Sequence, residues 1–289
     1  MTSMYYLGFH CFNMKGEVMT DLQKKELEIL KCFISICEKM KIKYFLVCGS
    51  VIGAVKYQGF IPWDDDIDVG LLRPDYERFV NEAHNYLPDN LFLQNYHTEK
   101  CFPLFFSKLR DSNTTYIEID KQNLPIHHGI CIDVFPIDGC PDDKRIQKKI
   151  ERKKKSAWNK SSCAMTMPSH WHKARLKAAF YRLFGYHKST GKVISKFEKY
   201  ISQWSVETSD LWCNHGNWQG LLEYAPKWHY GNGTFATFEG VKVRIPENYD
   251  EYLTQKYGDW RADLPEDKKE GHHYHIVCDV NNPYTKYIK

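Results

Sequence analysis

The sequence predicts an α+β fold in which a mixed sheet core is followed by added helices and a C-terminal hairpin and helix region. Strand-like apolar runs alternate with helical patterns up to about residue 140. Long helical stretches then extend over about 142–204, and two strand-like segments flank Glu239-Gly240 as a hairpin. We therefore divide the chain into a sheet core at 20–140 and a helical and mixed region at 141–289, packed on it as one continuous domain.

The first half of the chain supplies most of the predicted sheet. Thr20 and Gln23 form a capping box for a helix over about 21–41, and the apolar run Tyr44–Cys48 predicts a strand covered on both faces. Ser50 is the expected N-cap of a short helix that Gly59 ends. The further elements are a helix over 75–86, strands at 91–95, 105–110, 115–119 and 130–135, helices near 142–160, 170–186 and 192–204, the hairpin 234–238 with 241–245, and a helix over 248–257.

Composition excludes several classes of protein. The ten cysteines contain no C-x-x-C pair, which argues against a zinc finger or a thioredoxin-like motif. The first 19 residues lack the basic start and unbroken apolar core of a signal peptide, and no run approaches the roughly 18 apolar residues of a membrane helix. The net charge of +4 hides an acidic stretch at 64–68 and a basic block at 144–155. We expect a cytoplasmic protein without a nucleic-acid partner, and leave open peripheral contact with the inner face of the membrane.

The stretch Tyr44–Asp68 combines two features of a phosphate site. The Gly49-Ser50 turn opens a helix whose N–H groups can bind a phosphate. Asp66 and Asp68, two apart on a predicted strand, face the same way, and Asp133 lies between Ile132 and Val134 on another predicted strand. Three carboxylates can hold Mg²⁺ together with substrate phosphates. The alternative is that Asp64, Asp65, Asp66 and Asp68 form an exposed acidic turn.

Other polar and aromatic groups carry weaker indications. Lys108 and Arg110 lie two apart and so share one strand face, where they could neutralise the charge of a bound phosphate or are simply exposed cations. His128 or His273 could lie at an active-site rim, although a metal role for the 271–275 cluster is the less favoured reading. The basic block is better explained as a solvated helix face than as an anion-binding surface. The remaining candidates are tryptophans that either stack on a sugar or choline or belong to the core: Trp204, Trp212, Trp218 and Trp228.

Longer strings closely resemble one family. The segments GSVIGAVKYQGFIPWDDDIDVGLLRPDYERF, FSKLRDSNTTY, HHGICIDVFPIDGCP and FEGVKVRIPENYDEYLTQKYGDW resemble the LicD family of phosphocholine transferases, to which fukutin and fukutin-related proteins are also similar. The resemblance covers roughly 20–265 and implies a polymerase β-type nucleotidyltransferase core. It also implies transfer of phosphocholine or an alditol phosphate from CDP-choline or a CDP-alditol to a hydroxyl of a cell-envelope glycan, such as lipopolysaccharide, teichoic acid or capsule, with release of CMP.

The resemblance assigns roles residue by residue. Asp66 and Asp68 would hold Mg²⁺ (or Mn²⁺), with Asp133 as a third ligand or as the base for the acceptor hydroxyl. Gly49 and Ser50 would cradle the donor phosphates, helped by Lys108 or Arg110. The cysteine-based zinc element and membrane anchor of some animal relatives are not recognised here, which favours a bacterial-type enzyme. Two other functions stay open: a nucleotidyltransferase that places a nucleoside monophosphate from a triphosphate on a small molecule or protein, and a binding module, against which the retained carboxylates argue.

Overall fold

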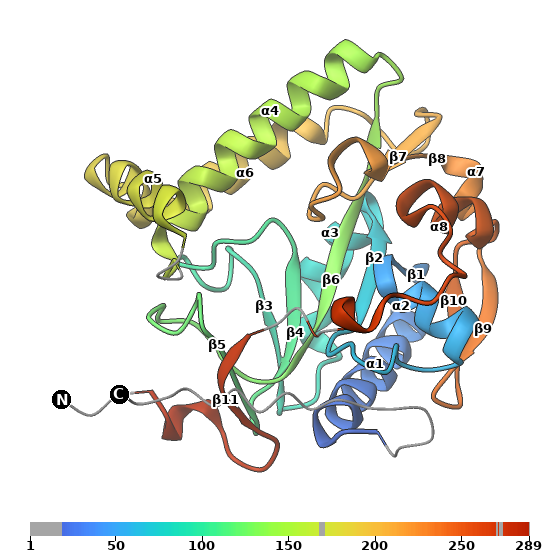
Figure 1. Cartoon of the computed structure of the whole chain (residues 1–289), viewed down its shortest axis with the longest axis horizontal. Helices are drawn as coiled ribbons and strands as arrows, with labels where there is room; N and C mark the ends of the chain where they lie inside the picture. Colours follow the sequence, from blue (N-terminus) through green and yellow to red (C-terminus); the bar gives the residue numbers. More distant parts are fainter. Residues whose placement is uncertain (1–18, 168–170, 270, 272–273, 289) are drawn as a thin grey trace.

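The computed structural model describes residues 19–167, 171–269, 271 and 274–288. Residues 1–18 lie outside the described residues, and with them nearly all of the N-terminal segment that was tested above for a signal peptide. His273 also lies outside them. The described chain forms a mixed sheet with helices packed around it and a helical layer on one side (Figure 1). The α+β class and the mixed sheet are therefore confirmed.

The central sheet has the strand order β1-β2-β6-β4-β3. Strands β2 and β6 are parallel, whereas the other neighbours are antiparallel. Strand β7 pairs with the far end of β6 and β8 pairs with β7, so the second half of the chain extends the same sheet. The bounds are β1 Tyr44–Leu46, β2 Asp68–Leu72, β3 Leu91–Gln94, β4 Ser107–Asp111, β6 Cys131–Cys140, β7 Leu211–Cys213 and β8 Tyr224–Pro226.

Helices α1 (Asp21–Met40) and α3 (Arg73–Glu82) complete the main core with the sheet. The predicted capping box at the start of α1 is present, with Thr20 and Gln23 each bonding the other's backbone N–H. The aromatic ring of Phe33 contacts those of Tyr44 and Phe79, joining α1 to β1 and α3. Burial of this apolar stripe is what fixes α1 against the sheet.

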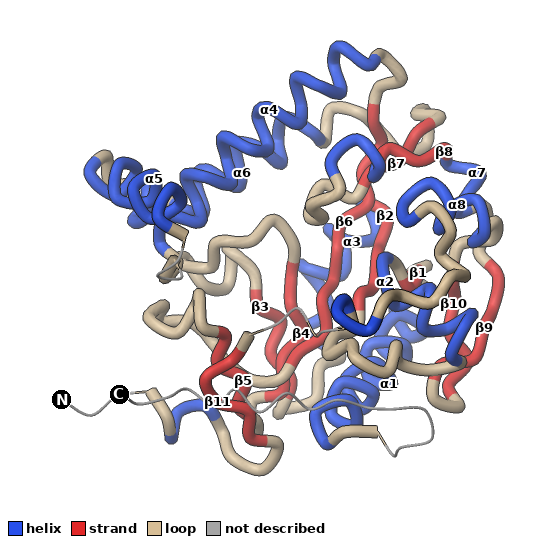
Figure 2. The backbone as a smooth tube through the Cα atoms, viewed as in Figure 1, coloured by secondary structure: helices blue, strands red, loops and turns tan. Residues whose placement is uncertain are grey.

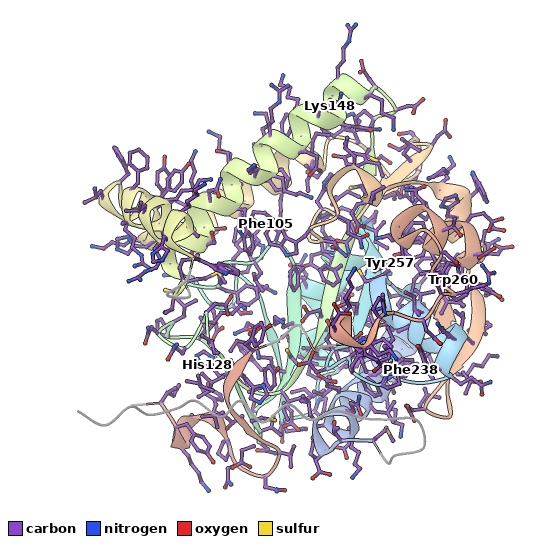
Figure 3. All side chains as sticks on the ribbon, in the orientation of Figure 1. Phe105, His128, Lys148, Phe238, Tyr257 and Trp260 are labelled. Atoms are coloured by element: carbon purple, nitrogen blue, oxygen red, sulfur yellow. The ribbon has the colours of Figure 1, made fainter. Side chains whose placement is uncertain are left out.

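The helical layer consists of α4 (Lys144–Ser161), α5 (His172–Leu183) and α6 (Thr190–Ile201). Helices α4 and α6 lie side by side, and α5 lies at their end (Figures 1 and 2). The apolar faces of α4 and α6 form a second, smaller core that includes Phe105 from the loop before β4. Figure 3 shows Phe105 between this layer and the sheet. The layer is thus attached to the sheet domain by its own core.

Shorter elements surround the sheet. The predicted hairpin is confirmed as β9 (Thr234–Phe238) and β10 (Val241–Ile245), and β10 lies beside β1. Strand β5 (Thr115–Glu118) pairs with β11 (His275–Asp279), a strand that the sequence analysis missed. Helix α7 (Lys227–Tyr230) was also missed, whereas α8 (Tyr249–Tyr257) ends as expected at Gly258. No helix of the described residues combines the length and apolar character needed to cross a bilayer.

The helix after β1 differs from its prediction. It begins at Cys48 as α2 (Cys48–Ile52) and continues as a π-helical turn over Gly53–Tyr57. Ser50 is therefore inside the helix and not its N-cap; its hydroxyl accepts a hydrogen bond from the Asp68 N–H at 2.9 Å. Gln58 ends the turn in the left-handed region, while a Cβ on Gly59 would lie 1.9 Å from Glu239 Oε1. Glycine at 59 thus leaves room for the Glu239 carboxylate of the hairpin, which also accepts a hydrogen bond from the Phe60 N–H at 3.2 Å.

Candidate active site

Asp68, Asp133 and Lys108 form a row across three strands. Asp68 on β2 is the register partner of Asp133 on β6, and Asp133 is the partner of Lys108 on β4. Residues directly opposite each other on neighbouring strands project from the same face of a sheet. The structure thus brings Asp133 beside Asp68, as the sequence pattern predicted, and adds Lys108 to the row.

Asp66 does not belong to the strand that carries Asp68. Strand β2 begins at Asp68, so the expectation that Asp66 and Asp68 share a strand face was wrong. Asp66 instead precedes the strand and lines a small cavity of about 20 Å³ together with Asp65 and Asp133. A cavity of this size holds about one water molecule or ion. Asp66 and Asp133 therefore still meet, although not through strand alternation.

Glu26 of α1 is a member of this site that the sequence analysis missed. It is buried, lines the small cavity, and its Oε2 atom has no hydrogen-bond partner among the described residues. Burial, followed by the nearby carboxylates of Asp66 and Asp65, raises its pKa well above the ordinary value. A signal existed in the sequence, because Glu26 interrupts the apolar stripe of α1 between Leu22 and Leu30. An acidic residue on a buried helix face points to a partner inside the protein.

Lys108 is the buried cation of the site. Its Nζ donates a hydrogen bond to Asp133 Oδ1 at 2.7 Å. Burial alone would lower the pKa of Lys108, but the carboxylate of Asp133 outweighs it and raises the pKa above the ordinary value. Lys108 therefore carries its charge at neutral pH and holds one oxygen of Asp133.

Arg110 lies apart from this pair, and its expected contact with donor phosphates stays a prediction. It is fully buried, and its guanidinium donates to Gln94 Oε1 and to the Gly129 carbonyl, with Glu118 at 3.4 Å. It lines neither of the two cavities described here. Arg110 instead ties β4 to β3, β5 and the loop before β6.

Gly49 and Ser50 stand behind the acidic residues. A Cβ on Gly49 would lie 3.3 Å from Asp64 Oδ2, so the first turn of α2 packs closely against the acidic segment. Ser50 is buried and holds the Asp68 backbone. The Cys48 N–H donates to the Tyr252 hydroxyl at 3.2 Å, which anchors the same turn to α8. The proposed phosphate role of Gly49 and Ser50 stays a prediction, since neither lines the two cavities described here.

A second cavity, of about 810 Å³, opens between the sheet and the helical layer. It shares Asp133, Lys108 and Glu118 with the small cavity. Trp158 and Trp218 meet edge to face in its wall, with ring centroids 4.0 Å apart. The other side chains that line it include three further aromatic rings and several charged groups: Phe106, Trp171, Tyr274, Lys121, Lys177 and Asp120.

Only one of the four predicted tryptophans, Trp218, lines this cavity. Trp212 belongs to the main core, Trp204 packs on the smaller helical core, and Trp228 is exposed on α7. Trp158 and Trp171, which were not predicted, line the cavity together with Trp218. Trp158 could have been recognised from the sequence, because it follows the helical spacing of the buried residues Ile150 and Lys154 on α4.

The histidines and the basic block have structural roles. His128 is fully buried, with Nε2 3.2 Å from the Leu124 carbonyl, so it does not lie at an active-site rim (Figure 3). Most cations of the basic block face solvent from α4, as expected, and Lys148 extends away from the sheet in Figure 3. Lys154 is the exception: it is buried, 3.0 Å from Glu151 and from the Asn217 carbonyl.

The carboxylate oxygens of the site suit a hard cation, but in this structure they do not converge as a complete set of metal ligands. Within the described residues no three His, Cys, Asp or Glu side chains converge as ligands. Asp66 and Asp133 nevertheless line one ion-sized cavity, and Glu26 places an unsatisfied oxygen among them. Carboxylate oxygens are the ligands that Mg²⁺ prefers, and a cation would relieve their mutual repulsion. Metal binding by Asp66, Asp68 and Asp133 stays a prediction.

Comparison with known proteins places this geometry in context. Residues 41–138 match the family model described as "LicD/FKTN/FKRP, nucleotidyltransferase domain". The chain is 29% identical over 276 residues to the lipopolysaccharide cholinephosphotransferase LicD of Haemophilus influenzae. This alignment covers 90% of this chain and 97% of that protein. It is also 38% identical over 60 residues to an uncharacterized protein of Rickettsia typhi, covering 20% of this chain and 19% of that protein. The matched family region spans β1 to β6 and therefore contains the row of Asp68, Asp133 and Lys108.

Proposed function

The chain belongs to the LicD family, and on that premise we propose that it transfers phosphocholine from CDP-choline to a hydroxyl of a cell-surface glycan such as lipopolysaccharide. The observation that carries the proposal is the Lys108–Asp133 pair, which lies where the ion-sized acidic cavity meets the large aromatic cavity. The name of the Haemophilus influenzae relative supports the choice of phosphocholine and of lipopolysaccharide. The mixed sheet with neighbouring strand carboxylates is compatible with a polymerase β-type core, which we include in the proposal.

The proposed step is a displacement at phosphorus. The acceptor oxygen forms a bond to the choline-bearing phosphorus of the donor, and the bond from that phosphorus to the bridging oxygen breaks, so CMP leaves. The hydroxyl proton passes to Asp133, whose Oδ1 is held by Lys108 at 2.7 Å, so Oδ2 is the atom we assign to accept it. Lys108 supplies a fixed positive charge beside the transferred phosphate, because its side chain is packed in place by burial while the Asp133 carboxylate keeps it charged.

A divalent cation, Mg²⁺ or Mn²⁺, is part of the proposal. Asp66 and Asp133, which share the small cavity, and Asp68, in register with Asp133, are the residues that would hold it. When bound, such an ion neutralises phosphate charge and orients the donor. Ser50 contributes by accepting a hydrogen bond from the Asp68 N–H, and the Asp133 N–H donates to the Ile67 carbonyl at 2.9 Å. These backbone bonds fix the carboxylate-bearing segments relative to each other.

The large cavity is proposed to accept the choline group. A quaternary ammonium is attracted to the faces of aromatic rings, and Trp158 and Trp218 present adjoining rings in the wall. Glu118 and Asp120 are close to Lys121, at 2.9 and 3.0 Å, so these carboxylates are already paired. The rings rather than these carboxylates are therefore assigned to the choline cation.

The test is a donor screen with purified full-length protein. CDP-choline, CDP-ribitol and nucleoside triphosphates are incubated with Mg²⁺ and with lipopolysaccharide as acceptor. We expect CMP release from CDP-choline that depends on the acceptor, and choline found on the glycan. Pyrophosphate release from a triphosphate would instead establish the nucleotidyltransferase alternative, and preference for CDP-ribitol would overturn the choline assignment.

A further inference from the structure

Helix α5 carries large apolar side chains on its outer face. Leu176, Phe180 and Leu183 are 74%, 54% and 86% exposed, and Phe184 just after the helix is 66% exposed. Their spacing of four, three and one residues places them in one stripe along the helix. Ala178 is the one buried residue of this helix. A solvated helix normally shows the opposite pattern, so the outer stripe calls for a partner.

The surroundings of this stripe are strongly cationic. Between Arg152 and Phe197 the sequence contains 12 Lys and Arg residues and no Asp or Glu. By their spacing from Leu176 on the helix, Lys177 flanks one side of the stripe and Arg175 the other, while Lys173 lies on the face of the stripe about one turn before Leu176. An apolar stripe flanked by cations, without acidic residues, is typical of helices that lie in the interface of an anionic membrane.

The same helix borders the large cavity from its inner side. Ala174, Lys177 and Ala178 line that cavity, as does Trp171 just before the helix. The stripe faces outward from the end of the helical layer, where α5 lies in Figure 1. A surface that covers the stripe would therefore lie next to the cavity.

We propose that α5 docks on an anionic lipid surface, with Leu176, Phe180, Leu183 and Phe184 inserted among the acyl chains and the flanking cations at the phosphates. Charge complementarity selects this occupant over a second copy of the chain. In a symmetric dimer the same cations would face each other across the interface, without acidic partners to neutralise them. Docking of α5 does not depend on the proposed transfer reaction, because it involves the outer face of the helix.

The experiment measures co-sedimentation of the full chain with vesicles, without donor or acceptor. We expect binding to vesicles of phosphatidylglycerol and phosphatidylethanolamine, weaker binding at high salt, and little binding to pure phosphatidylcholine. Phe180→Ser should weaken binding by about tenfold, since it removes one of the two aromatic rings of the stripe. Phe235→Ser is the matched control, because Phe235 is 51% exposed on the hairpin and lies outside α5.

Three results would overturn the proposal. The first is that the wild-type chain fails to bind anionic vesicles. The second is that Phe180→Ser and Phe235→Ser bind equally well, provided circular dichroism shows both folded. The third is that light scattering finds a wild-type dimer that Phe180→Ser dissociates while vesicle binding is unaffected, which would assign the stripe to a second copy. The vesicle experiment measures no step of the transfer reaction, so a negative result in it would not count against the transfer reaction that the donor screen tests.

Discussion

Asp133 is the residue on which the proposed chemistry depends most directly. Its replacement by Asn keeps the size of the side chain and an oxygen for Lys108, but removes the carboxylate that we propose as the acceptor of the hydroxyl proton. We expect Asp133→Asn to lower kcat for choline transfer by at least about 100-fold. CMP release from CDP-choline in the presence of acceptor measures this effect.

The stability of the same variant must be measured alongside its activity. Losing the carboxylate leaves the buried Lys108 charge without its partner, which costs about 3–5 kcal/mol in comparable cases. Urea unfolding therefore separates a folded, inactive enzyme from an unfolded one. Asp120→Asn is the control, because Asp120 lines the large cavity but lies outside the row of strand residues. Near wild-type turnover by a folded Asp133→Asn variant would refute the assignment of Asp133 as the base.

The lowered pKa of His127 predicts how the stability of the folded chain depends on pH. Burial, followed by the charge of Arg110, lowers its pKa from 6.5 to about 3. The neutral ring is also fixed by hydrogen bonds, since Nδ1 accepts from the Gly129 N–H and Nε2 lies 3.0 Å from Ser112 Oγ. The unfolded chain binds this proton more readily than the folded chain. The stabilisation is therefore complete above about pH 6.5 and is lost as the pH falls toward 3.

The measurement is a series of urea unfolding curves between about pH 7.5 and pH 5. His127 alone should reduce the free energy of unfolding by up to about 2 kcal/mol over this range. His127→Gln should flatten the slope of stability against pH, whatever its effect on stability at neutral pH. His84→Gln, at an exposed position of the short turn after α3, should leave the slope unchanged. An equal slope for all three proteins would contradict the role of His127.

Single residues of the site were predictable only where a pattern determines their neighbours. Asp133 was found because a carboxylate stood between apolar strand residues, and alternation correctly placed Lys108 and Arg110 on one face of β4. Alternation could not show which of these two cations reaches the cavities. That outcome depends on the packing of β3, β5 and the loop at Gly129 around Arg110, which are contacts between distant segments.

At the scale of elements, α1 positions the acidic segment through its first turn. Gln23 accepts from the Thr20 N–H with Oε1 and donates from Nε2 to the Asp64 carbonyl, both at 3.0 Å. Gln23→Glu keeps the capping box but places a carboxylate against that carbonyl and close to the acidic residues. We expect a loss of about 1–3 kcal/mol in stability and a roughly tenfold lower transfer rate. Chemical denaturation and the CMP assay measure the two effects.

Gln147→Glu is the matched control for this variant. Gln147 is also buried in the first turns of a helix, α4, and its Nε2 donates to the Pro141 carbonyl at 2.8 Å. The same substitution there should cost similar stability without changing the transfer rate, because Gln147 lines neither cavity. If both variants lowered the rate equally, the bond to Asp64 would have no special role in positioning the acidic segment.

Element boundaries near the site were the least predictable part of the chain. The sequence places Asp66 in a strand because Ile67 and Val69 suggest alternation, but pairing with β1 starts only where Val69 faces Leu46. The bond from the Asp68 N–H to Ser50 fixes this boundary, and it joins residues from two different elements. The start of α2 at Cys48 has the same cause, since local capping signals at Ser50 give way to contacts with β2 and α8.

At the scale of the whole molecule, the class of fold followed from the order of strand and helix patterns, whereas the position of the helical layer did not. Apolar periodicity predicts α4, α5 and α6 as helices but does not say where they pack. Their placement depends on Phe105, which joins the smaller helical core from the loop before β4. The large cavity is lined by residues of both the sheet domain and the helical layer, so the sequence could mark Trp158 by its helical spacing but could not show that Trp158, Trp171 and Trp218 line one cavity.

This arrangement predicts how a donor affects global stability. A ligand in the large cavity touches both the sheet, through Lys108 and Asp133, and the helical layer, through Trp158. CDP-choline at about 100 times its Kd, with Mg²⁺ present, should stabilise the chain by about 2.7 kcal/mol and raise Tm by about 5 °C. Quenching of tryptophan fluorescence should accompany binding, because Trp158 and Trp218 share the cavity wall.

Adding CMP with Mg²⁺, or CDP-choline without Mg²⁺, then distinguishes what the nucleotide, the choline group and the metal ion each contribute to the rise in Tm and to the quenching. CMP with Mg²⁺ should raise Tm without strong quenching if the rings bind choline, whereas CDP-choline without Mg²⁺ should give a smaller shift than the complete mixture. Asp66→Ala should abolish the dependence on Mg²⁺ while the quenching by CDP-choline at high concentration persists, since Asp66 lines only the small cavity. If Mg²⁺ left both Tm and donor affinity unchanged in the wild-type chain, the acidic cavity would not be a cation site. The carboxylate row would then act through Asp133 and Lys108 alone.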